Sequence, residues 1–150
     1  MTNGGDDPLI RNSKFATRNL IEVSAGLVFR NGQLLITQRH AHAHHGGLWE
    51  FPGGKREEGE TFEQCLVREL QEELGVTVAV GGLLESLTHD YPEKTVHLKF
   101  FVCRLVAGEP QPHGCAALKW VDRAGLSAHE FPAADGKLLE KLCALAELWR

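Results

Sequence analysis

The chain has 150 residues, with 16 Lys and Arg against 20 Asp and Glu, so its formal net charge is -4. Hydrophobic residues make up 43% of it, which is enough for one buried core and too many for a disordered chain. The negative charge disfavours binding to polymeric nucleic acid, and no apolar run in the sequence is long enough for a membrane-spanning helix.

The cysteines are scattered along the chain and form no C-x-x-C pair. They are Cys65, Cys103, Cys115 and Cys143. We interpret them as small buried residues in a reducing compartment rather than as disulfide partners or zinc ligands. Because the N-terminus also lacks the apolar core of a signal peptide, we expect a cytoplasmic protein with no membrane partner.

Residues 1–18 are polar, rich in Asn, Gly and Asp, and without periodicity, which predicts a flexible tail before a single domain at 19–150. The domain begins with the apolar run Leu20–Arg30, and a second run follows at Leu34–Thr37. Asn31-Gly32 stands between the two runs. An Asn-Gly pair in that place is the strongest short signal for a β-hairpin.

Turn residues and short apolar runs alternate along the following part of the chain. A histidine-rich loop at 40–47 precedes a short strand at 48–51, which Pro52-Gly53-Gly54 is expected to end. Further strands are predicted at 76–80, 83–88, 95–106 and 116–121, with Gly81-Gly82 separating the first two.

A closing helix is predicted from Asp135 to Trp149, because apolar residues recur there at helical spacing. The apolar stripe consists of Leu138, Leu142, Leu145 and Trp149. Asp135 is a suitable N-cap. A hairpin, a central helix, further strands and a terminal helix together indicate an α/β (α+β) fold, with a mixed β-sheet sandwiched between helices.

The central helix, Thr61–Leu74, is well specified by local sequence. Thr61 and Gln64 match the capping box at its start, and Gly75 can take the left-handed conformation that ends it. The apolar stripe of this helix repeats every four residues: Phe62, Leu66, Leu70 and Leu74.

A second face of this helix carries carboxylates, because Glu69, Glu72 and Glu73 stand at positions i, i+3 and i+4. Further acidic residues lie nearby: Glu57, Glu58, Glu60 and Glu63. Such a face is either a solvated surface or a site for a hard divalent cation such as Mg²⁺, which takes oxygen ligands. The bare backbone of Pro52-Gly53-Gly54, and Arg68, which can hold a carboxylate, favour the metal site.

The segment from Gly54 to Val76 resembles the catalytic box of the Nudix hydrolase family at every defined position. It reads Gly54, five residues, Glu60, seven residues, and then Arg68-Glu-Leu-Gln-Glu-Glu-Leu-Gly-Val76. The sequence around it, Leu48-Trp-Glu-Phe-Pro-Gly-Gly-Lys55, is similar to the MutT branch of that family. The similarity covers about Leu20 to Glu147.

This resemblance implies the Nudix fold and, for MutT-like members, hydrolysis of a nucleoside triphosphate to a monophosphate and pyrophosphate. It implies Mg²⁺ as the cofactor, with Mn²⁺ as a substitute. The implied metal ligands are Glu69, Glu72, Glu73 and the Gly53 carbonyl. The implied catalytic residues are Glu69, Arg68, Glu72 and Glu60. Glu69 is either a ligand or the general base, oriented by Arg68.

One position departs from the MutT pattern. MutT-like enzymes often carry a further metal-binding Glu six residues before the Trp of the Gly-Glu-Pro…Trp segment, and this chain has Gly114 there, six residues before Trp120. Either water or a neighbour such as Glu109 replaces the missing ligand, or one metal ion binds more weakly.

A nucleobase pocket between the early strands and the C-terminal helix is also implied. The matching positions are Leu20, Arg39, Phe51, Tyr91, Val96 and Asp135. Gly54, Lys55 and Arg56 are expected beside the phosphates, with a surface role as the alternative for the two cations. Phe51 and Tyr91 can stack on any base or pack in the core.

Asp135 bears on the choice of base, because the bacterial 8-oxoguanine enzyme usually has Asn at this point. An ionised Asp only accepts hydrogen bonds, unless burial keeps it protonated. Its alternative role is to cap the helix. We expect 8-oxo-dGTP as the substrate, in nucleotide-pool sanitation, and CTP, dCTP or a modified pyrimidine triphosphate as the second choice.

Other interpretations stay open. A Nudix-fold sensor would bind nucleotides without hydrolysing them, although Arg68 and the three carboxylates of the helix argue against it. The box itself does not exclude ADP-ribose or a nucleotide sugar. We interpret the histidine loop as solvated, with His44 bordering the pocket. We expect a small-molecule nucleotide as the partner and a monomer, with a dimer as the alternative.

Overall fold

The computed structural model describes residues 19–150, so the flexible tail predicted at 1–18 lies outside the described residues. The strands are β1 (Asn19–Arg30), β2 (Gln33–Gln38), β3 (Trp49–Glu50), β4 (Gly53–Lys55), β5 (Thr77–Asp90), β6 (Lys94–Ala107) and β7 (Ala117–Val121). The helices are α2 (Phe62–Leu74), α3 (Arg123–Leu126) and α4 (Gly136–Ala144), with the 3-10 turns η1 (Ala133–Asp135) and η2 (Ala146–Trp149).

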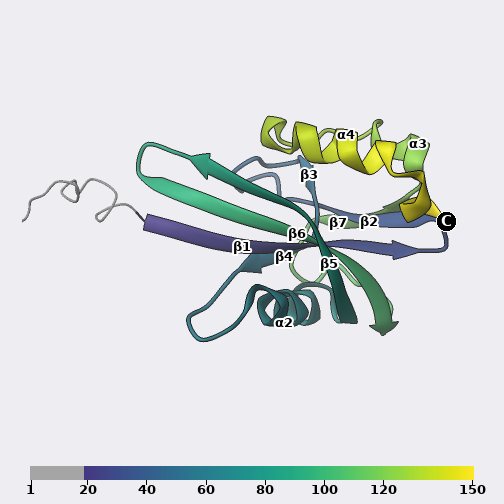
Figure 1. Cartoon of the computed structure of the whole chain (residues 1–150), viewed down its shortest axis with the longest axis horizontal. Helices are drawn as coiled ribbons and strands as arrows, with labels where there is room; N and C mark the ends of the chain where they lie inside the picture. The colour runs from purple at the N-terminus through teal and green to yellow at the C-terminus, as the bar shows by residue number, and fades with distance from the viewer. Residues whose placement is uncertain (1–18) are drawn as a thin grey trace, which may run out of the picture.

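Within residues 19–150 the strands form one mixed sheet of seven strands. β1 runs parallel to β6 and antiparallel to β2 and β4. β5 pairs with β6 at one edge, and β3 and β7 both pair with β2. Figure 1 shows α2 against one face of this sheet and α3 and α4 against the other. The predicted mixed sheet between helices is confirmed.

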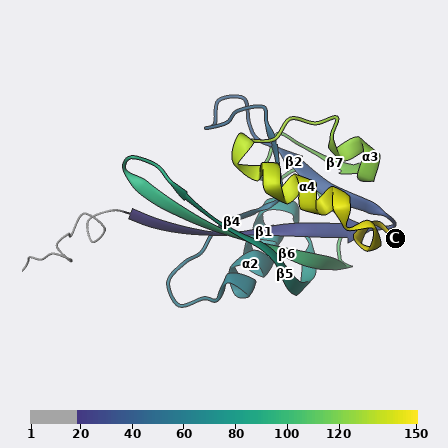
Figure 2. The ribbon, with the colours of Figure 1, turned by 45° about the horizontal axis from the view of Figure 1, so that its top comes forward.

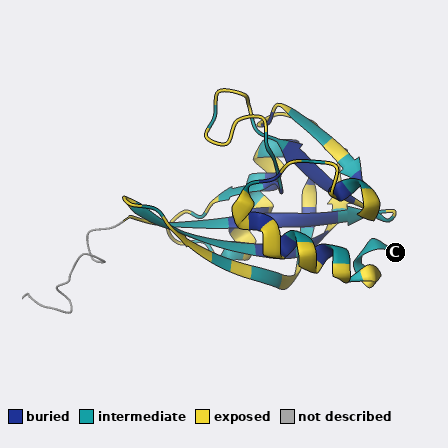
Figure 3. Ribbon diagram, turned by 90° about the horizontal axis from the view of Figure 1, so that it is seen from above, coloured by how far each residue is buried: buried dark blue, intermediate teal, exposed yellow. Residues whose placement is uncertain are grey.

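Each face of the sheet carries its own hydrophobic core. One core includes Leu138 and Leu142 of α4, and the other includes the apolar stripe of α2. Strand β2 contributes to both, because successive side chains of a strand point to opposite faces: Ile36 packs in the first core and Leu35 in the second. Figure 3 shows the buried stretches of the strands in the middle of the molecule, with exposed loops around them.

Helix α2 is built as its local sequence predicts. The Thr61 hydroxyl accepts a hydrogen bond from the Gln64 backbone N–H at 3.0 Å, and the Gln64 side chain accepts one from the Thr61 N–H at 2.9 Å. Gly75 ends the helix in the left-handed conformation, with φ at 72°. Leu66, Leu70 and Leu74 of the predicted stripe are fully buried, and Phe62 is partly buried.

The predicted Asn31-Gly32 hairpin is also present, with both residues at positive φ, 52° and 77°, as a two-residue type I′ turn requires. A second hairpin, β5–β6, is much longer. Figure 2 shows it extending beyond α4 together with the start of β1. Residues of this hairpin also line the pocket described below.

Several element boundaries were predicted wrongly. Gly81-Gly82 does not separate two strands, because β5 continues through it with a shift of register against β6. The short strand predicted at 48–51 does end before Pro52-Gly53-Gly54, since β3 ends at Glu50, but Gly53 and Gly54 then pair with β1 as part of a strand, β4, that was not predicted. A short helix, α3, was not predicted; the Asp122 side chain caps it by accepting a hydrogen bond from the Gly125 N–H at 2.7 Å.

The closing helix is shorter than predicted, because α4 ends at Ala144 and a separate 3-10 turn carries Trp149. Trp149 still packs against the core, edge-on to Phe29 at 5.2 Å between ring centroids. Asp135 precedes α4, but its side chain makes no capping hydrogen bond. Its carboxylate is therefore available for another role.

Candidate active site

The site begins with the close approach of β4 to two other elements. A Cβ atom on Gly53 would overlap the Ser24 carbonyl oxygen of β1, so no larger residue fits there without moving the backbone. A Cβ atom on Gly54 would overlap the Glu69 carboxylate of α2. The two glycines thus let a bare strand lie directly against the acidic face of α2.

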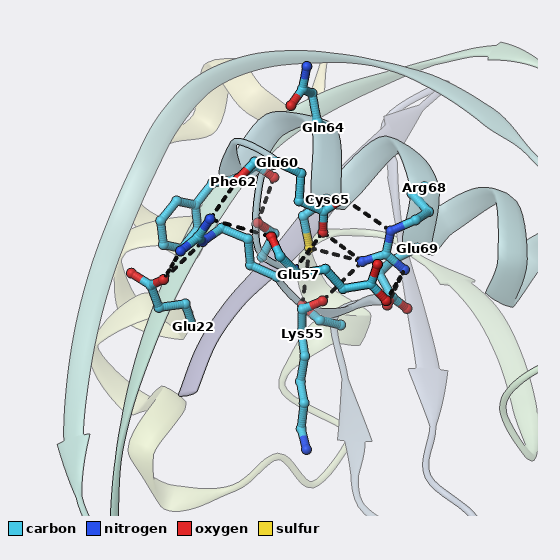
Figure 4. A network of polar contacts seen from close by, with 12 residues as sticks. Glu22, Lys55, Glu57, Glu60, Phe62, Gln64, Cys65, Arg68 and Glu69 are labelled. Atoms are coloured by element: carbon cyan, nitrogen blue, oxygen red, sulfur yellow. Dashed lines mark hydrogen bonds and ion pairs between the residues drawn. The ribbon is translucent and has the colours of Figure 1, made fainter. Parts of the chain in front are cut away.

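Arg68 is the centre of a network of carboxylates (Figure 4). Its Nη2 and Nε atoms donate to the two oxygens of Glu60 at 2.7 and 3.1 Å. Its Nη1 atom donates to Glu69 at 2.9 Å and to Glu72 at 3.4 Å. Sequence reasoning identified Arg68 as the residue that holds a carboxylate, and the bidentate partner is Glu60.

Arg68 and burial together give Glu60 and Glu69 different proton affinities. Arg68, and then the Glu57 backbone N–H, lower the pKa of Glu60 to about 2. Burial raises the pKa of Glu69 above its usual value, although Arg68 offsets part of this effect. Glu69 is therefore the stronger proton acceptor of the two.

Glu73 lies deeper than the other two carboxylates of the helix face. It accepts a hydrogen bond from the Gly53 N–H at 3.2 Å. Burial, and then the nearby charge of Glu50, raise its pKa to about 7. The side chain of Glu72, in contrast, is 61% exposed. Glu69 and Glu73 thus place neighbouring negative charges where solvation is reduced, and a cation would relieve their repulsion.

These residues fit a hard divalent cation, although among residues 19–150 no three His, Cys, Asp or Glu side chains already converge as a closed metal cage. All donors offered are oxygens: the carboxylates of Glu69, Glu72 and Glu73 and the carbonyl of Gly53. An ion such as Mg²⁺ usually keeps several waters and takes only one or two carboxylates together with substrate phosphates. An open acidic face suits that mode of binding.

Gly114 lies directly against this face, as expected for the position that departs from the MutT pattern. Its N–H donates to the Glu73 carbonyl at 3.1 Å, and a Cβ atom there would be 3.1 Å from Glu73 Cγ. The suggestion that Glu109 replaces the missing carboxylate finds no support in its contacts. Glu109 forms an exposed ion pair with Arg30 at 2.9 Å, and Arg30 also stacks on Trp120.

A cavity of about 720 Å³ opens beside the carboxylates. It brings together six of the residues predicted to bind the substrate: Arg39, Phe51, Gly54, Lys55, Tyr91 and Asp135. Val96 and His44 also line it, whereas Leu20 does not and is 62% exposed. Glu73 and Gly53 form part of the wall, so the cavity connects the base-binding positions with the acidic face.

Two of these residues have structural partners as well. Arg39 donates to the His44 carbonyl oxygen and, through Nη1, to Glu50 at 3.1 Å, so it holds the histidine loop against β3. Phe51 is 5% exposed and stacks on Phe131 at 5.1 Å between centroids. Its ring thus packs in the core and also reaches the cavity.

Sequence reasoning missed Glu50, which lines the cavity together with Asp135 and Glu73. Burial raises its pKa, and its charge in turn raises the pKa of both neighbours. Asp135 is 8% exposed, and burial followed by the charge of Glu50 raises its pKa to about 6. The available signal was a lone acidic residue inside the apolar strand 48–51.

A family model described as the NUDIX domain matches residues 24–141. The chain belongs to the Nudix family. It is 38% identical to the 8-oxo-dGTP diphosphatase of Escherichia coli K12 over 123 residues, which are 81% of this chain and 95% of the relative. It is also 38% identical to the CTP pyrophosphohydrolase of the same strain over 126 residues, or 84% of this chain and 93% of the relative.

Solved structures agree with this assignment. The solution structure of the E. coli ORF135 protein matches with a TM-score of 0.74 and 36% identity, covering 87% of this chain and 93% of that one. A MutT structure, from a study of Aliivibrio salmonicida and Vibrio cholerae, matches with a TM-score of 0.70 and 32% identity, covering 83% and 96%. The predicted Nudix fold is confirmed, and the chain is a Nudix hydrolase.

Members of this family act on small nucleotide substrates and need a divalent metal ion. Among residues 19–150, no helix is long and apolar enough to cross a membrane.

Proposed function

We propose that this Nudix hydrolase is a Mg²⁺-dependent pyrophosphohydrolase that converts 8-oxo-dGTP to the monophosphate and pyrophosphate. One observation carries the proposal: a single cavity joins the Glu73 carboxylate to the buried Asp135 carboxylate. A triphosphate at the acidic face then places its base beside Asp135. Several relatives named 8-oxo-dGTP diphosphatase support the same substrate.

The metal would be held by Glu69, Glu72, Glu73 and the Gly53 carbonyl, with Mn²⁺ as a substitute for Mg²⁺. When bound, such an ion neutralises phosphate charge and assists attack of water on phosphorus. Lys55 lines the cavity beside the glycine turn and adds a cation for the phosphates. In Figure 4 its side chain extends away from the Arg68 network.

Glu69 is the proposed general base. Its raised pKa makes it a better proton acceptor than Glu60, whose pKa is about 2. Arg68 holds the Glu69 carboxylate at 2.9 Å and fixes its orientation toward the bare backbone of Gly54. Glu60 then serves as the anion that holds Arg68, rather than as an acid or base.

The carboxylates of Asp135 and Glu50 support 8-oxoguanine as the base that the cavity binds. Oxidation of guanine at C8 creates an N–H donor at N7, and an ionised Asp135 or Glu50 can accept that hydrogen bond. A protonated Asp135 could donate one to a base carbonyl in addition. The same carboxylates accept from the N4 amine of cytosine, so CTP or dCTP hydrolysis is the second candidate. The relative named CTP pyrophosphohydrolase supports it.

Pyrophosphate release from a panel of nucleotides tests this proposal. With Mg²⁺ we expect kcat/KM to be highest for 8-oxo-dGTP, lower for dGTP and CTP, and lowest for ADP-ribose, with no release in EDTA. A preference for CTP or dCTP would favour the second candidate. Tight binding without release from any nucleotide would contradict both and indicate a nucleotide sensor.

A cytoplasmic role in nucleotide-pool sanitation follows from the proposed reaction, because removal of 8-oxo-dGTP keeps it from the polymerase during DNA replication. We propose that the protein is a monomer. Light scattering at micromolar concentration distinguishes it from the alternative dimer.

A further inference from the structure

An ion pair outside the catalytic box anchors the loop that leads into α2. Arg56, directly after β4, donates through Nε to Glu22 of β1 at 2.9 Å, and its Nη2 atom bonds the same oxygen. The Arg56 backbone N–H also donates to the Glu22 carbonyl at 2.7 Å. Both side chains are only about a quarter exposed, at 27% and 24%.

The remaining guanidinium nitrogen of Arg56 turns toward the loop. Its Nη1 atom donates to the Glu60 carbonyl oxygen at 2.7 Å, and the guanidinium lies 5.5 Å from the Phe62 ring. Every edge of this cation is therefore engaged within the protein. The expectation that Arg56 contacts phosphate is not supported by this arrangement, whereas Lys55 beside it does line the cavity.

Within the loop at 57–60, the Glu57 N–H donates to the Glu60 carboxylate at 2.8 Å and the Glu60 N–H donates to the Glu57 carbonyl at 3.3 Å. Residues 57–59 are exposed, and Gly59 adopts a positive φ of 90°. No residue of this loop belongs to either hydrophobic core. Arg56 ties this loop to β1, because its Nη1 atom donates to the Glu60 carbonyl at 2.7 Å and to the Glu57 carbonyl at 3.5 Å while its Nε atom donates to Glu22.

The position of Glu60 determines the positions of Arg68 and Glu69. Its carboxylate holds Arg68 by two hydrogen bonds, and Arg68 in turn holds Glu69 at 2.9 Å. A displacement of the Glu60 backbone would therefore move the Arg68 guanidinium, and with it the carboxylate of Glu69. Small misplacements of a reacting group are costly, since about 1 Å can reduce a rate roughly 100-fold.

We propose that Glu22 and Arg56 are positioning residues that set the orientation of Glu69 through Glu60 and Arg68. This inference rests on the proposed function, in which Glu69 accepts a proton from water. Neither residue touches the substrate in this scheme. Each acts by holding the loop at 57–60 in the one geometry that presents Arg68 to Glu69.

A second ion pair on the same strand provides a matched control. Arg30 at the other end of β1 donates to both oxygens of Glu109, at 2.9 and 3.3 Å, and stacks on Trp120 at 4.2 Å. It therefore has the same chemistry as Arg56 but no contact with the Arg68 network. If the Glu22–Arg56 pair only stabilises the fold, its loss should change kcat no more than loss of the Arg30–Glu109 pair does.

The test compares Arg56→Gln, Glu22→Gln and Arg30→Gln by melting temperature, kcat and KM for the preferred nucleotide. We expect Arg56→Gln to lower kcat roughly 10-fold with KM within about twofold. Glu22→Gln should lower kcat less, and Arg30→Gln should leave it unchanged. Arg56→Lys, which retains the charge, should recover part of the lost kcat.

A double variant tests the proposed route. If Arg56 acts through Glu60, adding Arg56→Gln to Glu60→Gln should cause no further loss of kcat, because the two effects are not additive along one path. Equal kcat values for Arg56→Gln and Arg30→Gln at equal melting temperature would overturn the proposal. So would fully additive losses in the double variant.

Metal binding separates this inference from the proposed function. If the wild-type protein hydrolyses no nucleotide, the proposed function fails, but Mn²⁺ affinity measured by electron paramagnetic resonance still reports on Glu69. We then expect Arg56→Gln to bind Mn²⁺ several-fold more weakly than Arg30→Gln. Equal Mn²⁺ affinities would overturn the positioning role without reference to activity.

Discussion

The backbone N–H of Gly53 donates a hydrogen bond to the Glu73 carboxylate over 3.2 Å, which joins the glycine turn to the acidic face of α2. Gly53 can occupy this place because it has no Cβ atom to overlap β1. The bond orients the deepest carboxylate of the site toward the cavity. Gly53 and Glu73 both line the cavity.

Replacing Glu73 should abolish catalysis without unfolding the protein. We expect Glu73→Gln to reduce kcat roughly 100-fold or more, and Glu72→Gln to do the same, because each removes a charged oxygen ligand. Glu63→Gln, on the exposed first turn of the same helix, is the matched control and should retain activity. Near-normal turnover in both site variants would contradict the ligand assignment.

Metal affinity should rise with pH between about 6 and 8. The pKa of Glu73 is about 7 without metal, so below that pH the carboxyl is mostly protonated and the ion must displace the proton. Calorimetry in two buffers of different ionisation enthalpy measures the protons released on Mn²⁺ binding. If no protons are released on Mn²⁺ binding at pH 6, or if Mn²⁺ affinity does not change with pH, Glu73 is not protonated as this prediction requires.

Asp135 should destabilise the fold at neutral pH. Its pKa is 3.8 in the free side chain and about 6 when folded, so the folded state holds more protons between these values. The free energy of unfolding therefore falls as pH rises from about 4 to 6, by up to about 3 kcal/mol, and stays low above that range. Asp135→Asn should raise the melting temperature at pH 8 and change it little at pH 4.

The control for this prediction is Asp122→Asn. Asp122 is exposed and caps α3, so its replacement removes no buried charge. A similar rise in melting temperature in both variants would show that burial of Asp135 is not the cause.

Local signals explain which parts of the fold were predictable. The capping box of Thr61 and the terminal Gly75 define α2 without reference to the rest of the chain. Gly81-Gly82 has the same appearance as a strand end, but pairing with β6 carries β5 through it. That pairing is a long-range contact, and local sequence does not specify it.

The candidate site was predictable to the extent that it lies within one motif. The box residues are close in sequence, so helical spacing alone brings Glu69, Glu72 and Glu73 together. Glu50 was missed because its burial depends on the packing of the histidine loop and η1 around the cavity. The ion pair between Arg30 and Glu109 could not be predicted either, because it joins segments that are distant in sequence.

Arg39 should stabilise the folded protein by pairing with the negative charge of Glu50. The two side chains form an ion pair at 3.1 Å, and both are about one third exposed or less. Removing the cation leaves a partly buried carboxylate without its partner, so we expect Arg39→Gln to lower the free energy of unfolding by about 1–2 kcal/mol. The double variant Arg39→Gln/Glu50→Gln should regain most of this loss, because no unpaired charge remains. Chemical denaturation of the three variants measures both effects, and an equal loss in the single and double variants would show that Arg39 stabilises the histidine loop through the His44 carbonyl instead.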